Sequence, residues 1–281
     1  MLTPNGGTRS ARGPHRPASD FPVFSLGCIC RCCYLIQTPL FTNPFLPVRI
    51  AVISDIHSNL EALQAVLDVI DRSSVDAVHC LGDIVGYNAD PVACVQLVRE
   101  RCDRAVLGNH DAAVAREVDL VALPPDGRQA ARHNRVQLSE SDLDYLAALP
   151  VSTTVDDVTL VHATPDVPTD WRRLTTYPAA KSQFDHFDTS VCFIGHTHVP
   201  AVMSDRLGVF QVREGNRYLI NVGSVGQPRD HNPKASFGIF DTDAFTYKNH
   251  RVEYNVSEAM RKIRSTPDLP DRLARRLREG V

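Results

Sequence analysis

An apolar, β-branched run of strand length, Val48–Ser54, opens a repeating pattern of strand and helix signals. A helical stripe of leucines follows it, and the next segments are a strand at Val75–Leu81, a helix at Asp90–Arg101 and a strand at Arg104–Leu107. This order and spacing predict right-handed crossovers between strands, and therefore a mostly parallel sheet covered by helices.

Serine residues mark two expected helix starts. Ser58 precedes Glu61 by three residues, which is the spacing of a capping box at the start of the first helix. Ser139 and Ser141 are the candidate caps before Leu143–Leu149, within a longer helical stretch.

The later part of the chain carries shorter strands. Residues Ala112–Leu149 are expected to be helical, and two amphipathic helices at Ser257–Arg264 and Leu269–Glu279 close the chain. Short turns between the strands favour hairpins and an antiparallel second sheet. The strands are expected at Val158–His162, Val191–Ile194, Arg217–Val222, Ser236–Thr242 and Phe245–Tyr254.

Residues 1–47 differ from everything that follows. They hold seven of the 19 prolines, four arginines and one acid, Asp20, with no helical or strand period. We expect a disordered N-terminal extension at 1–47 and one domain at 48–281. The alternative is that the extension is translated upstream DNA and that the natural start lies near Val48. Four clustered cysteines in it lack the spaced pairs of a zinc site: Cys28, Cys30, Cys32 and Cys33.

Composition excludes some classes of protein. A hydrophobic share of 43% is enough for a buried core. The sequence contains no apolar run of 18 or more residues, so a membrane span is not expected. The net charge of −3 carries no basic excess, so no nucleic-acid groove is expected. Scattered cysteines without paired spacing fit reduced thiols, and we expect a cytoplasmic protein. They are Cys80, Cys94, Cys102 and Cys192.

Five of the expected strands end in residues that bind metals. Ligands collect beyond the carboxyl ends of parallel strands, so these five segments should converge on one site. The residues in chain order are Asp55 and His57, then Gly82-Asp83, then Gly108-Asn109-His110-Asp111, then His162, and finally Gly195-His196-Thr197-His198.

The types of ligand restrict the metal. Carboxylates, imidazoles and one amide, without thiolate, suit manganese, iron, cobalt, nickel or zinc. Two metal ions that share a carboxylate are typical of phosphate chemistry, and Asp83 is the natural bridge because its two oxygens can face both ions. We expect two divalent ions, with manganese as the first choice.

The ordered blocks resemble the calcineurin-like metallophosphoesterase superfamily, whose pattern is D-x-H, G-D, G-N-H-[DE], a lone H and G-H-x-H. Beyond them, Asn221–Asp230 resembles the N-P-G-S-V-G-Q-P-R-D loop of a bacterial and archaeal branch, with Val222 in place of its proline. That branch includes phosphodiesterases and relatives of diadenosine tetraphosphatases. The resemblance implies an α/β fold, a four-layer α/β/β/α sandwich of two mixed sheets flanked by helices.

The resemblance also implies a role for each matching residue. Asp83 would be shared between two metals, and a bridging hydroxide would attack phosphorus. His110 would protonate the leaving oxygen, oriented by Asp111, and Arg229 would clamp the phosphate. The first metal would be held by Asp55, His57 and His198, and the second by Asn109, His162 and His196.

These features predict a dinuclear metallophosphoesterase that hydrolyses a small-molecule phosphoester, such as a phosphodiester or a nucleotide. One alternative is a metal-free scaffold of the same fold, but that would predict missing ligands, and none is missing. A serine/threonine protein phosphatase is the other alternative. Such enzymes usually carry an arginine soon after G-D and a glutamate after G-N-H, and this chain has Asp111 there. The sequence does not indicate an oligomeric state.

Overall fold

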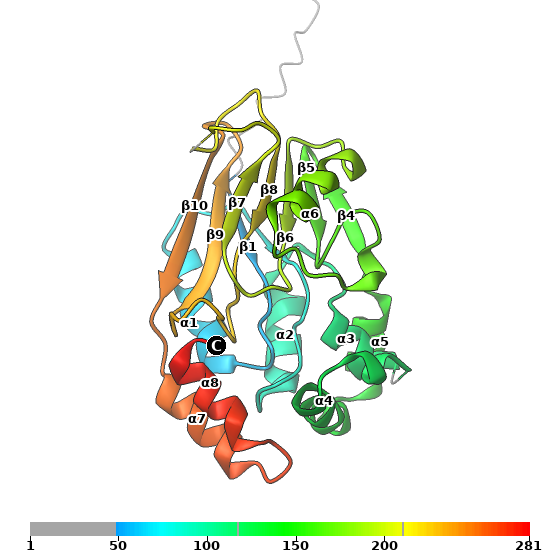
Figure 1. Cartoon of the computed structure of the whole chain (residues 1–281). Coiled ribbons are helices and arrows are strands. Elements are labelled where there is room, and N and C mark those ends of the chain that lie inside the picture. The colour runs from blue at the N-terminus through cyan, green and yellow to red at the C-terminus, as the bar shows by residue number, and fades with distance from the viewer. Residues whose placement is uncertain (1–48, 117, 210) are drawn as a thin grey trace, which may run out of the picture. The chain divides into compact units, whose positions relative to one another are not determined.

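Two five-stranded sheets form the centre of the fold in the computed structural model, which describes residues 49–116, 118–209 and 211–281 (Figure 1). The first sheet has the order β10-β9-β1-β2-β3, and the second has the order β4-β5-β6-β8-β7. Their strands are β1 (Arg49–Ile53), β2 (Ala77–Cys80), β3 (Arg104–Ala105), β4 (Ser152–Val155), β5 (Val158–Val161), β6 (Val191–Ile194), β7 (Ala201–Ser204), β8 (Tyr218–Asn221), β9 (Ala235–Asp241) and β10 (Thr246–Val252).

Both sheets mix parallel and antiparallel pairs. In the first sheet β1 runs parallel to β2 but antiparallel to β9, so that Ala51 lies between Val78 and Ile239. In the second sheet β5, β6 and β8 are parallel, and β4 and β7 are antiparallel edges. The expectation of an antiparallel second sheet is therefore wrong. Among the late strands whose short turns suggested it, β9 and β10 form a hairpin in the first sheet instead.

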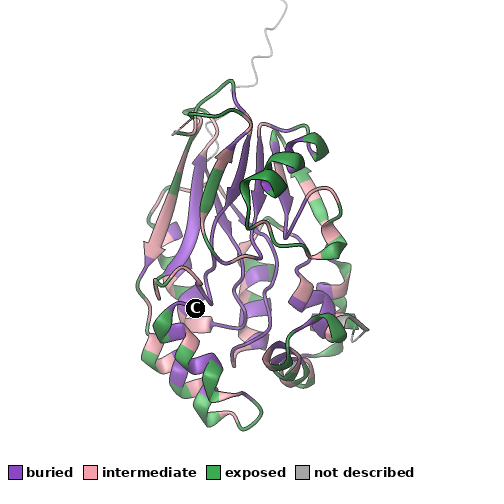
Figure 2. Cartoon of the chain, in the orientation of Figure 1, coloured by how far each residue is buried: buried purple, intermediate pink, exposed green. Residues whose placement is uncertain are grey.

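The alternation of side chains along the strands produces the layers. Ile50 and Val52 of β1 face the second sheet, where they join Phe193 of β6 in the core between the two sheets. Ala51 and Ile53 point the other way, into the core under the helices. Successive strand residues face opposite sides of a sheet, so each sheet buries both faces. Figure 2 shows this burial along the central strands, with exposed residues on the helices and edges.

Helices cover the outer face of each sheet. α1 and α2 pack on the first sheet, and the short α6 with η3 covers the second, which confirms the α/β/β/α sandwich (Figure 1). The helices are α1 (Leu60–Asp71), α2 (Pro91–Arg101), α3 (Asn109–Arg116), η1 (Val118–Ala122), α4 (Pro125–Gln137), α5 (Glu140–Ala148), η2 (Pro168–Asp170), α6 (Tyr177–Lys181), η3 (Ser182–His186), α7 (Val256–Ser265) and α8 (Asp271–Glu279).

The two expected helix starts have different outcomes. Ser139 forms a capping box with Asp142 at the start of α5, as expected. At α1 the cap is Asn59, whose side chain accepts a hydrogen bond from the backbone N–H of Ala62. Ser58 is not the cap, because its hydroxyl donates to Asn134 Oδ1 at 2.9 Å and ties the first strand's loop to α4.

The expectations for residues 1–47, including the cysteine cluster, lie outside the described residues. Within the described part, the four scattered cysteines are free thiols, as expected. The helices described there include none that is long and apolar enough to cross a membrane.

Candidate metal centre

The polar residues expected at the strand ends meet at the carboxyl edge of β1, β2, β5 and β6 and at the start of α3. Three groups of ligand atoms converge there, with the atoms of each group within 4.8 Å of one another. Asp83 belongs to two of these groups and His57 belongs to two. The groups are Asp55 with His57 and His198, His57 with Asp83 and His110, and Asp83 with His162 and His196.

The loops that carry these residues have an unusual backbone. Asp55, His57 and Asp83 have φ angles of 53°, 51° and 51°, in the left-handed region that side chains other than glycine seldom adopt. His196 and His198 share this conformation. Such strain persists where surrounding contacts enforce it and is concentrated at functional sites. Here the backbone N–H groups of Asp55 and His57 donate to the carbonyls of Gly82 and Asp83, which ties the loop after β1 to the loop after β2.

Glycine lets the loop after β3 approach the loop after β2. A Cβ added at Gly108 would lie 2.2 Å from both the backbone nitrogen and Oδ1 of Asp83. Any larger residue would therefore displace Asp83, so the glycine before Asn109 is required by packing. At Gly195, an added Cβ would lie 2.5 Å from Asp55 Oδ2, and the same argument applies.

Four histidines are each held by a backbone carbonyl. The four hydrogen bonds are 2.5–3.1 Å long. They run from His57 to the carbonyl of Val85, from His162 to that of Leu81, from His196 to that of Trp171 and from His198 to that of Gln227. Because a carbonyl can only accept, the bonded ring nitrogen carries the proton, and the other nitrogen of a neutral ring presents a lone pair. Metal-binding histidines are usually oriented in this way.

The free ring nitrogens face one another in pairs. Nε2 of His57 lies 3.1 Å from Nε2 of His198, and Nε2 of His162 lies 3.2 Å from Nδ1 of His196. Two lone pairs at this separation repel unless a cation lies near both. The side-chain oxygen of Asn109 lies 3.3 Å from Nε2 of His162, so it joins the second pair. The donor set therefore fits two divalent metal ions.

The two carboxylates complete the sites. Ser54 and the backbone N–H of His196 donate to Oδ2 of Asp55, while its buried Oδ1 accepts no hydrogen bond and lies 3.2 Å from Nε2 of His198. Oδ2 of Asp83 lies 3.3 Å from Nε2 of His162 and 3.6 Å from Nε2 of His57. Asp83 thus faces both histidine pairs, as a bridging ligand must.

The electrostatics favour bound cations. Burial raises the pKa of Asp83, but the imidazoles of His162 and His110 outweigh it and hold that pKa well below its usual range. Burial lowers the pKa of His162, yet the carboxylate of Asp83 raises it on balance to about 9. An imidazole must lose this proton to bind a metal, so a metal ion would take the place of the proton beside Asp83.

His110 lies beside the metal ligands, and its ring contacts those of His57 and Tyr87 at centroid distances of 4.8 and 4.4 Å. Its buried Nδ1 has no hydrogen-bond partner. The expectation that Asp111 orients this ring is wrong. Both oxygens of Asp111 accept hydrogen bonds from backbone N–H groups, those of Ile84, Val85 and Gly108. Asp111 therefore holds the loop after β2 and the loop after β3 together and does not hydrogen-bond to the ring of His110.

A cavity of about 620 Å³ opens over the ligands, and Arg229 is among the residues that line it. Its role as a phosphate clamp stays a prediction. The guanidinium of Arg229 donates to Gln227 Oε1 at 3.0 Å and lies over the ring of Tyr87. Sequence reasoning missed Arg173, which lines the same cavity, because a loop arginine carries no local signature. Tyr87, which supports both His110 and Arg229, was also missed.

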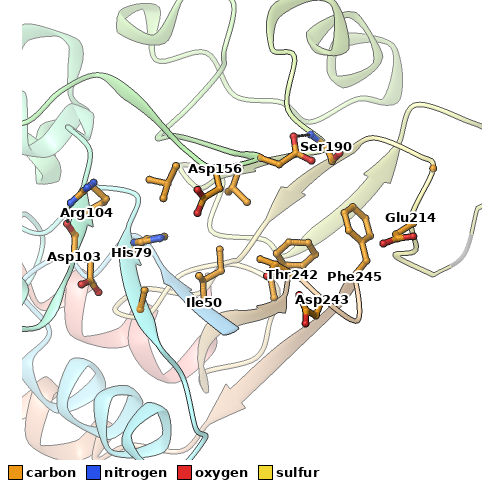
Figure 3. Close-up of a pocket in the computed structure, with 16 residues that line it drawn as sticks. Ile50, His79, Asp103, Arg104, Asp156, Ser190, Glu214, Thr242, Asp243 and Phe245 are labelled. Atoms are coloured by element: carbon orange, nitrogen blue, oxygen red, sulfur yellow. Dashed lines mark hydrogen bonds between the residues drawn. The ribbon is translucent and has the colours of Figure 1, made fainter. Parts of the chain in front are cut away.

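A second cavity, of about 720 Å³, lies at the opposite edge of the strands (Figure 3). Acidic residues such as Asp103, Asp156 and Asp243 lie around it, with Ile50 between them and Phe245 on the side of Glu214. None of the three groups of metal-binding type found among the described residues lies there. The chemistry therefore belongs to the carboxyl edge.

Comparison with known proteins agrees with this geometry. Residues 48–244 match the family model of the calcineurin-like phosphoesterase superfamily domain. An uncharacterized protein of Methanocaldococcus jannaschii is 40% identical over 239 residues, which cover 81% of this chain and 96% of that protein.

Two solved structures are similar over most of the chain. A metallophosphoesterase from Sphaerobacter thermophilus is 38% identical, with a TM-score of 0.74 over 84% of this chain and all of that one. A hypothetical protein from Pyrococcus horikoshii shares the fold at 20% identity, with a TM-score of 0.69 over 83% of this chain and 99% of that one. The chain belongs to the calcineurin-like phosphoesterase superfamily.

Proposed function

We propose that this chain is a metal-dependent hydrolase of small-molecule phosphoesters with a dinuclear metal site, for which manganese is the expected metal. The observation that carries the proposal is the position of Asp83 between two pairs of histidines whose free nitrogens face one another. Two divalent ions bound there would neutralise charge on the phosphoryl oxygens and lower the pKa of a water molecule.

The chain's own residues supply the remaining functions. Arg229 and Arg173 line the cavity and offer planar donors to phosphoryl oxygens. His110 lies in the same cavity, and burial lowers its pKa to about 4. An anionic phosphoryl group beside the ring would raise that pKa, so that the ring can donate a proton to the departing oxygen. The carboxylate of Asp83 also fixes His110, because its Oδ1 accepts the backbone N–H of His110 at 2.8 Å.

The alternatives are supported less well. A metal-free scaffold does not need seven buried or half-buried ligands, four of which are histidines held by backbone carbonyls. A nuclease would need a basic groove, but residues 48–281 contain 26 basic and 32 acidic residues. A protein phosphatase remains disfavoured by Asp111, which serves here as a tie between backbone loops.

The proposal is tested by a substrate panel with the purified chain and manganese. The panel compares 4-nitrophenyl phosphate, bis(4-nitrophenyl) phosphate and a dinucleoside polyphosphate. Hydrolysis should require the metal, stop with EDTA and return when manganese is added back. A chain that binds no manganese and hydrolyses none of these compounds would support the metal-free scaffold instead.

A further inference from the structure

A third cavity, of about 470 Å³, adjoins the metal cavity and is lined by different chemistry. It lies over the outer face of the second sheet, beside α6 and the segment that precedes it. The two cavities share Arg173 and Arg229 in their linings, so they meet at this arginine pair. Most of the remaining lining is aliphatic and includes Leu174, Ile194, Val199, Ala201, Met203 and Leu219.

The arginine pair is placed to hold an anion. Arg229 is half-buried, and its Nε is buried without a hydrogen-bond partner. Arg173 is exposed and follows Trp171 by two residues, and the carbonyl of Trp171 holds His196. None of the ion pairs found in the described part of the chain includes either arginine. Two guanidinium groups without acidic partners, beside a metal centre, match a phosphoryl group.

We propose that the aliphatic cavity binds the retained, uncharged arm of a phosphodiester whose phosphoryl group lies between the arginine pair and the metal ligands. This inference rests on the proposed function and narrows its substrate class. The cavity volume falls in the range that holds an aryl or nucleoside-sized group, and its aliphatic walls favour an uncharged one. A monoester would leave the cavity empty.

The position of His110 decides which arm the cavity holds. His110 lines the metal cavity but not the aliphatic cavity. In the reaction the oxygen of a water molecule forms a bond to phosphorus, and the bond from phosphorus to the leaving oxygen breaks. That oxygen keeps the electron pair and takes a proton on the His110 side, and the attacking water molecule releases one proton to solvent. The products are an alcohol and a monoester, and the monoester's arm is the one in the aliphatic cavity.

The test keeps the leaving group constant and varies the retained arm. Three 4-nitrophenyl phosphodiesters with manganese serve as substrates, with methyl, phenyl or thymidine 5′-yl as the second arm. The inference predicts a kcat/KM at least about tenfold higher for the phenyl and thymidine esters than for the methyl ester, from burial of the larger group.

Two variants on β7 separate the cavity from the rest of the site. Ala201→Phe should fill the cavity and remove the advantage of the larger arms, mostly through KM, while the methyl ester is hydrolysed as before. Val202→Phe is the matched control. Val202 is 51% exposed and pairs with Ile220 of the inter-sheet core, so it lies on the opposite face of β7 and outside the cavity lining. The Val202→Phe variant should therefore hydrolyse all three esters at unchanged rates.

A second measurement needs no variant. Phenyl phosphate, a product with the arm retained, should inhibit the unaltered enzyme at least about tenfold more tightly than methyl phosphate. Equal kcat/KM for all three esters, or equal inhibition by the two phosphates, would overturn the inference while the proposed function stood. Failure to hydrolyse any of the three esters would instead overturn the proposed function, and this inference with it.

Discussion

Replacing Asp83 by asparagine changes one charge at the centre of the site and little else. Oδ1 of Asp83 accepts the backbone N–H of His110, so an asparagine oxygen would keep that bond. Its NH₂ group would then face Nε2 of His57 and of His162, where the carboxylate oxygen lies at 3.6 and 3.3 Å. An N–H donor would thus stand where each metal ion needs a lone pair.

The expected loss follows from Coulomb's law. Removing a unit negative charge about 4 Å from a cation, at an effective dielectric constant of about 20, costs about 4 kcal/mol for each unit of the cation's charge, and therefore about 8 kcal/mol for a divalent ion. That corresponds to a loss of up to about 10⁶-fold in metal affinity for each ion. Activity should collapse, and metal content should fall from two ions per chain toward one or none.

Thermal unfolding with and without manganese measures this loss. At about 100 times the dissociation constant, each bound ion stabilises the fold by about 2.7 kcal/mol. For a domain of this size that raises Tm by about 5–11 °C for each site. Asp83→Asn should abolish most of the rise, whereas Asp243→Asn, at an exposed turn residue far from the site, should retain it. An unchanged rise with near-normal turnover in Asp83→Asn would refute the bridging role.

The remaining predictions concern His110, the glycine beside its ring and the N-terminal end of the domain. His110→Ala should lower kcat by about 10²–10⁴ without loss of metal, and the loss should shrink for esters with very acidic leaving groups; an equal loss across leaving groups would mean a role other than proton transfer. Gly86→Ala should lower kcat by about 10²-fold, because the added Cβ would lie 2.5 Å from His110 Nδ1. Gly208→Ala is the control: it is also at positive φ but has open space around it, so it should lower only Tm. Equal effects of the two variants on kcat would contradict this. A chain that begins at Val48 with an added methionine should hydrolyse substrate at a similar rate, and an insoluble or inactive product would show that the preceding residues are needed.

Much of the metal centre could be predicted because its signals are local. Each ligand directly follows an apolar strand, and the carboxyl ends of parallel strands share one edge. The backbone at Asp55, His57 and Asp83 could not be predicted in this way, because local propensity opposes a left-handed conformation at non-glycine residues. Hydrogen bonds between loops that are distant in sequence hold it.

The sheet assignment of the late strands needed information that the residues do not carry locally. β9 buries both faces, and such an apolar run fits either sheet until its partner is known. Its pairing with β1, with Ala51 opposite Ile239, joins segments that are far apart in the chain. The edge strand β7 was missed because half of its residues are exposed, so it lacks a buried apolar run.

The central claim is that two metal ions bind on either side of Asp83. Anomalous diffraction from crystals grown with manganese tests it most directly. The account predicts two peaks about 3.5–4 Å apart, one among Asp55, His57 and His198 and the other among Asn109, His162 and His196. A single peak, no peak at saturating manganese, or peaks only in the acidic cavity of Figure 3 would contradict it.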